Sequence, residues 1–193
     1  MSGEDKLFAV CLGGRAERCN TELHDVVFVT GASIEAAYDQ LPGKWFGLPD
    51  GLHIDVWTEL DVVDGHEVSL AASPAESGPK LYFINLGAYR PGEFAEAHAC
   101  AFLVAASPEE AKRRAKATLL TQGAREVHTD DLYEVDSCIE LGAVNDFHVR
   151  LARTGRQVPL EIHASYHPLP KAIIDAHVAR RAAETAAYRP PFD

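Results

Sequence analysis

Acidic and imidazole side chains stand two residues apart at two places in the first third of this sequence. Glu22 is followed by His24, and His53 is followed by Asp55. Side chains two residues apart in a strand project from the same face of the sheet, so the members of each pair can lie together. Imidazole and carboxylate groups at this spacing suit the binding of a divalent metal ion, and they equally suit general acid–base catalysis.

The same pattern recurs in the second half of the chain, which predicts an internal duplication. The segment Lys-Leu-Phe-Ala-Val over 6–10 resembles Lys-Leu-Tyr-Phe-Ile over 80–84. At this same offset along the chain, the polar residues that the alignment equates are Glu22 with Glu96 and His24 with His98. With one residue inserted in the second copy, the alignment equates His53 with His128 and Asp55 with Asp130. Six further inserted residues are needed to align the last strands of the two copies.

An arginine follows a glycine turn in each copy and completes the set of candidate residues. Arg15 follows Gly13-Gly14, and Arg90 comes shortly after Gly87. Backbone N–H groups at such a turn, together with a guanidinium, can bind a carboxylate or a phosphate. The predicted ligand-binding residues are Arg15, Glu22, His24, His53, Asp55, Arg90, Glu96, His98, His128 and Asp130, of which His24 and His98 are the candidate metal ligands.

A structural role is the alternative for each of these residues. A histidine at the start of a strand can donate to a neighbouring carboxylate or carbonyl, and duplication preserves a folding device as readily as a binding site. The glycine turns can likewise be simple tight turns. No nucleotide-binding glycine pattern is present in the sequence, so the choice stays between a small-molecule or metal site and a fold-stabilising network.

Each copy is predicted to contain two strands, a helix and a hairpin, which together position these residues. Short apolar or Val-rich runs indicate the strands, Ser33 is a good N-cap, and Asp64-Gly65 is a strong two-residue hairpin signal. The elements predicted for the first copy are strands over 7–12 and 24–30, a helix from Ser33 to about Leu41 that stops before Pro42, and strands over 53–63 and 66–70. Those of the second copy include a helix over about 108–121 and strands over about 127–141 and 147–151, joined by a longer turn.

The sequence therefore predicts an α+β fold of two tandem β-β-α-β-β repeats about a pseudo-two-fold axis, with an added C-terminal helix. The repeats cover 6–71 and 80–153, and a Ser-, Pro- and Gly-rich linker covers 72–79. The extension over 154–193 is predicted to contain one more strand within 157–164 and an Ala-rich helix over about 170–188.

The bulk composition narrows the class of protein. The net charge of −11 disfavours general binding to nucleic acid and docking on anionic lipid. The charged start lacks the apolar segment of a secretory signal, and no apolar run approaches the roughly 20 residues that span a bilayer. These features predict a cytoplasmic protein with no nucleic-acid or membrane partner.

Several short blocks also carry a resemblance to a known family. They are Leu12-Gly13-Gly14-Arg15, Glu22-x-His24-Asp25, Leu52-His53-Ile54-Asp55 and Leu60-Asp61-Val62-Val63-Asp64-Gly65, with Leu81 to Tyr89 in the second copy. Together they resemble the bacterial domain of unknown function 1543, which often occurs as a tandem pair. The resemblance covers about Lys6 to Leu151 and implies a bacterial origin, but no known chemistry and no catalytic residues.

Three functional hypotheses follow, and the sequence does not decide whether the protein is an enzyme. The leading one is a protein that binds a small molecule or a divalent metal ion near the repeat interface. The alternative is a non-catalytic module that forms a homodimer through sheet edges or the Ala-rich helix. The third is a metal-dependent enzyme that resembles a permuted vicinal-oxygen-chelate fold.

Overall fold

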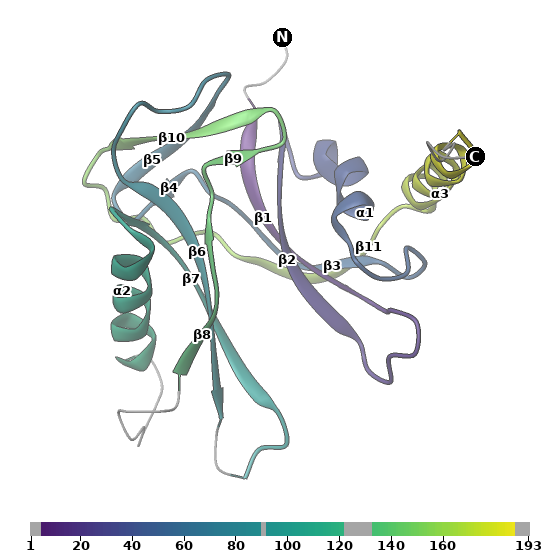
Figure 1. Cartoon of the computed structure of the whole chain (residues 1–193), viewed down its shortest axis with the longest axis horizontal. Helices are drawn as coiled ribbons and strands as arrows, with labels where there is room; N and C mark the ends of the chain where they lie inside the picture. The colour runs from purple at the N-terminus through teal and green to yellow at the C-terminus, as the bar shows by residue number, and fades with distance from the viewer. Residues whose placement is uncertain (1–4, 90–91, 122–132, 188–193) are drawn as a thin grey trace, which may run out of the picture. The chain divides into compact units, whose positions relative to one another are not determined.

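The computed structural model describes residues 5–89, 92–121 and 133–187. It divides into two compact units, one formed by Met1–Leu60 with Leu160–Asp193 and the other by Asp61–Pro159. Every strand pair is antiparallel, and helices join or follow the strands (Figure 1). The predicted α+β class is confirmed. In the described ranges, no helix has both the length and the apolar character needed to cross a bilayer.

The first unit is a four-stranded sheet with a helical segment packed on it. Its strand order is β11-β3-β1-β2. The strands are β1 (Lys6–Gly14), β2 (Leu23–Gly31), β3 (His53–Glu59) and β11 (His163–Pro168). Strand β1 is central, and its residues Phe8, Val10 and Leu12 are buried against Val29 and Leu41. The strand continues through Gly13-Gly14, beyond the predicted end at Leu12, because both glycines pair with β2.

The connection between β2 and β3 differs from the single helix that was predicted. A 3₁₀-helix, η1 (Glu35–Gln40), passes directly into a short α-helix, α1 (Leu41–Lys44). The Ser33 hydroxyl accepts a hydrogen bond from Ala36 N–H at 3.3 Å, as expected of a capping serine. The predicted stop before Pro42 is wrong, because this proline lies in the first turn of α1, where its nitrogen needs no hydrogen-bond acceptor.

From Leu160 onward, the C-terminal extension belongs to the first unit. Its strand lies at His163–Pro168, later than the predicted 157–164, and pairs with β3. The Leu169 N–H then donates to Leu52 O at 3.1 Å, and Leu169 and Ile174 join the core. Helix α3 (Lys171–Ala187) confirms the predicted Ala-rich helix over the described residues.

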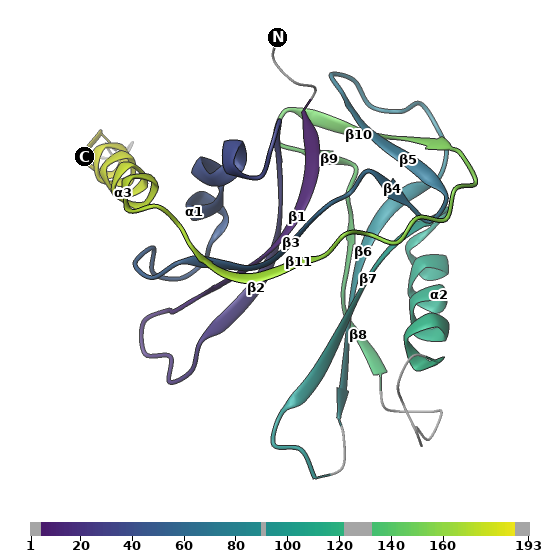
Figure 2. The same ribbon diagram turned by 180° about the vertical axis from the view of Figure 1, so that it is seen from behind.

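The second unit contains two sheets. One has the order β7-β6-β8 and consists of β6 (Lys80–Tyr89), β7 (Glu96–Ala105) and β8 (Tyr133–Glu140). Helix α2 (Pro108–Thr121) lies along it and packs Ala111 and Ala115 against Tyr82 and Ile84 (Figure 2). The other sheet has the order β4-β5-β10-β9 and consists of β4 (Val62–Val63), β5 (His66–Ala71), β9 (Ala143–Val144) and β10 (Phe147–Arg153).

Tight turns close both hairpins of this second sheet. Asp64 and Gly65 have φ values of 51° and 77°, which confirms the predicted two-residue turn. In the second copy Val144 pairs with Phe147, so Asn145-Asp146 forms an equally short turn, with Asn145 at φ 53°. The longer turn predicted there is wrong, because Asn tolerates the left-handed conformation that a two-residue turn requires.

Strand pairing supports the internal duplication residue by residue. Gly13 pairs with His24 in the first copy, and Gly87 pairs with His98 in the second. The β1–β3 pairing has a bulge after Cys11, and the β6–β8 pairing has one after Asn85, the residue that the alignment equates with Cys11. Equivalent central strands therefore carry equivalent neighbours and irregularities.

The last hairpin of each copy pairs with the last hairpin of the other copy, and together they form one sheet. Strand β5 belongs to the first sequence repeat and pairs with β10 of the second. Ser69 lies opposite Arg150, which is its own counterpart in the second copy, so this sheet has a local two-fold arrangement. The compact units consequently do not follow the sequence repeats, because residues 62–71 are part of the second unit.

A polar side chain from each helical segment forms hydrogen bonds with the backbone at the end of the adjacent strand. Gln40 accepts from Thr30 N–H at 3.3 Å and donates to Thr30 O at 2.6 Å. Its counterpart in the second copy is Arg114, which donates to Val104 O at 2.7 Å and to Asp64 at 2.6 Å. Asp64 in turn accepts from Val104 N–H at 3.1 Å. In the second copy, the Arg114–Asp64 pair thus binds the backbone N–H and C=O of one strand-end residue, as the Gln40 amide does in the first copy.

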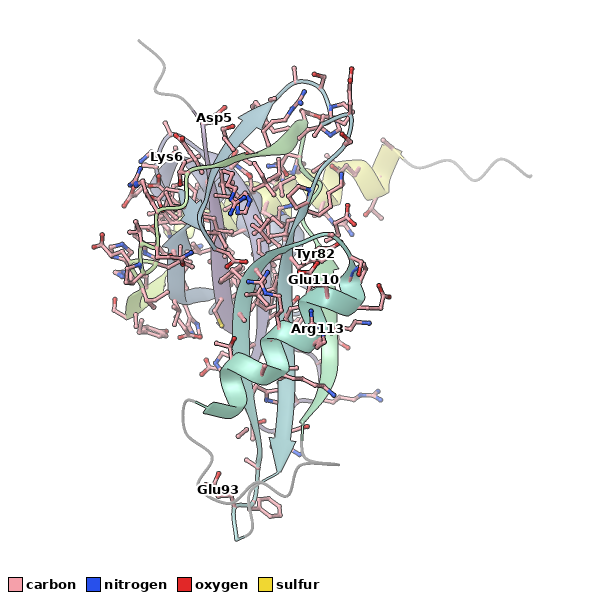
Figure 3. All side chains as sticks on the ribbon, turned by 90° about the vertical axis from the view of Figure 1, so that its left-hand side faces the viewer. Asp5, Lys6, Tyr82, Glu93, Glu110 and Arg113 are labelled. Carbon is pink, nitrogen blue, oxygen red and sulfur yellow. The ribbon has the colours of Figure 1, made fainter. Side chains whose placement is uncertain are left out.

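We predict that Arg114→Ala lowers the free energy of unfolding by about 1–3 kcal/mol, because it leaves Asp64 and Val104 O without their shared donor. The matched control is Arg113→Ala on the same helix, where the side chain is exposed and the expected change is within about 0.5 kcal/mol (Figure 3). Urea denaturation followed by circular dichroism measures both, and equal losses in the two variants would contradict this role of Arg114.

Candidate functional site

Three residues stand side by side across the sheet of the first unit. Gly13 in β1 pairs with His24 in β2 on one side and with His53 in β3 on the other. Directly paired residues project from the same face, and neighbouring strands are about 4.8 Å apart. Because Gly13 has no side chain, the two imidazoles can reach toward each other over its backbone. The register alone therefore brings the two imidazoles to the same face of the sheet, one on each side of Gly13.

Two carboxylates complete this cluster, which we call the Gly13 cluster and define as Glu22, His24, His53 and Asp55. His53 Nε2 lies 3.1 Å from Glu22 Oε1 and 3.4 Å from Asp55 Oδ1. His24 Nε2 lies 3.2 Å from Asp55 Oδ2 and 3.9 Å from Glu22 Oε2. Asp55 occupies the bulge of β3, a position that often redirects a side chain at a functional site. Both predicted i, i+2 pairs thus meet in one place.

Burial and protonation of His53 distinguish it from the other three residues. Its side chain is 3% exposed, whereas those of His24 and Glu22 are about half exposed. His53 Nδ1 lies 2.8 Å from Gly51 O, and because a carbonyl only accepts, Nδ1 carries the proton. In the neutral ring, Nε2 then presents a lone pair to the two carboxylates.

The close approaches around His53 are not hydrogen bonds. His53 Nε2 and Asp55 Oδ2 are both buried and lack a partner with acceptable hydrogen-bond geometry. Short distances between a nitrogen lone pair and carboxylate oxygens are repulsive unless a proton or a cation lies between them. The arrangement therefore requires a bound positive species, which can be a proton on imidazole or a metal ion.

A tyrosine from outside the repeats covers the buried histidine. The ring of Tyr166 in β11 lies 4.4 Å from that of His53, centroid to centroid, at an angle of 46°. Sequence reasoning did not include this residue, because it is far from His53 along the chain and only the β11–β3 pairing brings the two together. No local pattern in the sequence signals such a contact.

The second copy contains a related but different set of residues. Gly87 pairs with His98 and with Glu134, so the counterpart of His53 is Glu134. By the same register Asp136 is the counterpart of Asp55. The alignment with His128 and Asp130 is wrong, because all of the inserted residues precede β8. His128 and Asp130 themselves lie outside the described residues.

Arg15, Glu96 and His98, the other predicted residues that the structure describes, are not part of the Gly13 cluster. His98 Nε2 lies 3.8 Å from Glu96 Oε2, so the predicted pair in the second copy does come together. Arg15 is exposed and contributes its backbone oxygen, which accepts from Leu48 N–H at 2.6 Å. Arg90 lies outside the described residues. The structure thus unites four of the ten predicted residues in the first unit.

The fit of the Gly13 cluster to a metal ion is incomplete in the present geometry. No group of three or more His, Cys, Asp or Glu in the described part of the chain is arranged, as it stands, to hold a metal. The donor types nevertheless match, since imidazole nitrogen and carboxylate oxygen are the usual ligands of Zn²⁺ and similar ions. The Nδ1–H bond from His53 to Gly51 O is the outer contact that orients metal-binding histidines.

Comparison with known proteins now places this antiparallel α+β protein in a family. The family model described as Domain of Unknown Function (DUF1543) matches residues 19–70 and 93–143, which together are just over half of the chain. This chain belongs to that family, and the predicted resemblance is confirmed. The two matched regions correspond to the two copies.

This chain is also similar to a solved structure in both sequence and fold. The crystal structure of a protein Il1583 from Idiomarina loihiensis is 34% identical in sequence, with a TM-score of 0.69. The match covers 86% of this chain and 99% of that one. Among curated proteins, none matches this sequence.

We predict that Gly13→Ala destabilises the protein by about 1–3 kcal/mol, because the added methyl group would collide with His53 Nε2 and Asp55 Oδ2. Gly43→Ala is the control, since a β-carbon at that position would have nothing within 4 Å and alanine favours the helix there. Thermal unfolding compares the two variants. An unchanged melting temperature for Gly13→Ala would show that His53 and Asp55 do not crowd this backbone.

Proposed function

We propose that this protein binds a divalent transition-metal ion at the Gly13 cluster of its first unit. The observation that carries the proposal is the buried Nε2 atom of His53, which has no hydrogen-bond partner and faces two carboxylates. A metal ion would remove the repulsion between these groups and use the lone pair that the Nδ1–H bond to Gly51 O leaves available.

The donor set favours particular metals. Two imidazoles and two carboxylates give a mixed nitrogen and oxygen environment, which suits Zn²⁺, Co²⁺, Ni²⁺ or Fe²⁺ better than Ca²⁺ or Mg²⁺. His53 and Asp55 come from one rigid strand, whereas His24 and Glu22 lie on and just before β2. The half-exposed pair would leave one side of the ion open to solvent or to a small ligand.

Binding would require a modest rearrangement, since the ligand set is not assembled as it stands. Glu22 and His24 are exposed enough to rotate, while His53 is fixed by burial, by Gly51 and by the Tyr166 ring. We therefore expect His53 to act as the fixed ligand and the two β2-side residues to close onto the ion.

A general acid–base role is the second candidate, because a proton shared between His53 and Glu22 would satisfy the same atoms. That role needs no metal, and the titration below separates the two. The homodimeric interaction module and the permuted vicinal-oxygen-chelate enzyme stay predictions.

Isothermal titration of the tag-free protein with Co²⁺ and Zn²⁺ tests the proposal. We expect one equivalent of either ion to bind, with the visible absorption of Co²⁺ reporting nitrogen and oxygen ligands. His53→Ala and His24→Ala should each weaken binding at least about tenfold, because each removes a ligand worth more than about 1.4 kcal/mol. Elemental analysis of the protein as purified provides an independent readout.

His148→Ala is the matched control, since His148 lies in β10, which pairs with β5 and β9 and not with a strand that carries the Gly13 cluster. It should bind the metal like the parent protein. The proposal fails if Co²⁺ binds with less than about a tenth of an equivalent, or if His53→Ala and His148→Ala behave alike.

A further inference from the structure

A second pocket lies in the first unit, between the α1 segment and helix α3. Its volume is about 590 Å³, within the range of small-molecule sites. Figures 1 and 2 both show α3 beside α1, and both elements belong to the same compact unit. The loop that follows α1 forms one wall of the pocket and α3 forms the other. None of the residues of the Gly13 cluster lines this pocket.

The loop wall is aromatic and apolar. Trp45 and Phe46 lie with ring centroids 4.4 Å apart, and Pro42 and Pro49 extend the same surface. Trp45 is largely buried and its Nε1–H donates to Leu48 O at 3.1 Å, so its polar atom is already satisfied. Phe46 is 59% exposed, so its ring offers apolar surface that a ligand could remove from water. This wall suits a flat apolar body.

The helix wall is cationic, although the protein as a whole has a net charge of −11. One face of α3 presents His177, Arg180, Arg181 and Glu184 to the pocket, at the i, i+3, i+4, i+7 spacing. Arg181 lies 3.7 Å from Glu184 and is paired. Arg180 has no acidic partner within the described ranges and instead approaches His177 Nδ1 at 3.3 Å.

The neighbouring imidazole does not compete for an anion. Burial, followed by the charges of Arg180 and Arg181, lowers the pKa of His177, so the ring is neutral at pH 7 and accepts from Arg180. The guanidinium of Arg180 is thereby oriented beside the pocket with its other donors unused by any carboxylate of the described residues. A planar guanidinium in this setting is suited to bidentate contact with an acidic group.

We propose that this pocket binds a small amphiphilic anion: a flat apolar ring system that carries a carboxylate or a phosphate. The ring would cover Phe46 beside the small exposed part of Trp45, and the acidic group would contact Arg180, with Arg181 adding positive charge. The opposed characters of the two walls select such a ligand, since a neutral aromatic would leave Arg180 unpaired and a simple anion would leave Phe46 exposed.

Titration calorimetry with three matched probes tests this inference on the full-length, metal-free protein. The probes are 1-naphthoate, 1-naphthyl phosphate and the neutral 1-naphthamide. We expect one or both acids to bind at least about tenfold more tightly than the amide, since a charge-assisted bidentate contact exceeds a neutral hydrogen bond. The better acid identifies the acidic group that the pocket prefers.

Two local readouts fix the position of binding. The chain has two tryptophans, and the indole N–H signal of Trp45 should move in nitrogen–proton spectra while that of Trp57 stays in place. Arg180→Gln should weaken binding of the acids about tenfold and leave the amide unchanged, whereas Arg113→Gln in the second unit should have no effect (Figure 3). Absence of binding by both acids at about 1 mM would overturn the proposal, as would equal binding of the amide or an unaffected Arg180→Gln variant.

Discussion

The absence of a side chain at Gly13 is the constraint on which the candidate site depends. The residue lies in the central strand of its sheet, with His24 and His53 directly beside it in the two neighbouring strands. A β-carbon there would occupy the space in which His53 and Asp55 meet. The glycine is thus a requirement of the side chains around it, because backbone pairing alone would accept any residue at this position.

The same constraint shows how the two copies diverged. Gly87 pairs in the same way with His98 and Glu134, so the second copy keeps the backbone pairing and has a glutamate at the position of His53. The contacts at the strand ends have also diverged, since the Gln40 amide and the Arg114 guanidinium donate to equivalent backbone oxygens. Duplication has preserved backbone positions more faithfully than the side-chain functions built on them.

The pairs of site residues and the hairpin turn of the first copy could be predicted from the sequence, because local spacing determines them. The i, i+2 pairs Glu22 with His24 and His53 with Asp55 do converge, and the turn at Asp64-Gly65 has the expected conformation. The predicted equivalence of the two sites failed because it depended on register, since the insertion before β8 shifted the counterpart of His53 from His128 to Glu134. Contacts across distant segments had no local signal. Tyr166 reaches His53 only through the β11–β3 pairing, and the basic face of α3 meets Trp45 and Phe46 only after the C-terminal extension has docked.

The response of His53 to a metal ion tests the proposed site most directly, because the ion would take the place of a proton at Nε2 while the Nδ1–H bond to Gly51 O stays intact. Long-range nitrogen–proton spectroscopy of the imidazoles reports it. The metal-free protein should show His53 protonated at Nδ1, bonded to Gly51 O, and its Nε2 resonance should shift toward that of a metal-bound nitrogen when Zn²⁺ is added. An Nδ1 that carries no proton, or an Nε2 resonance that does not respond to Zn²⁺, would contradict the proposed metal site.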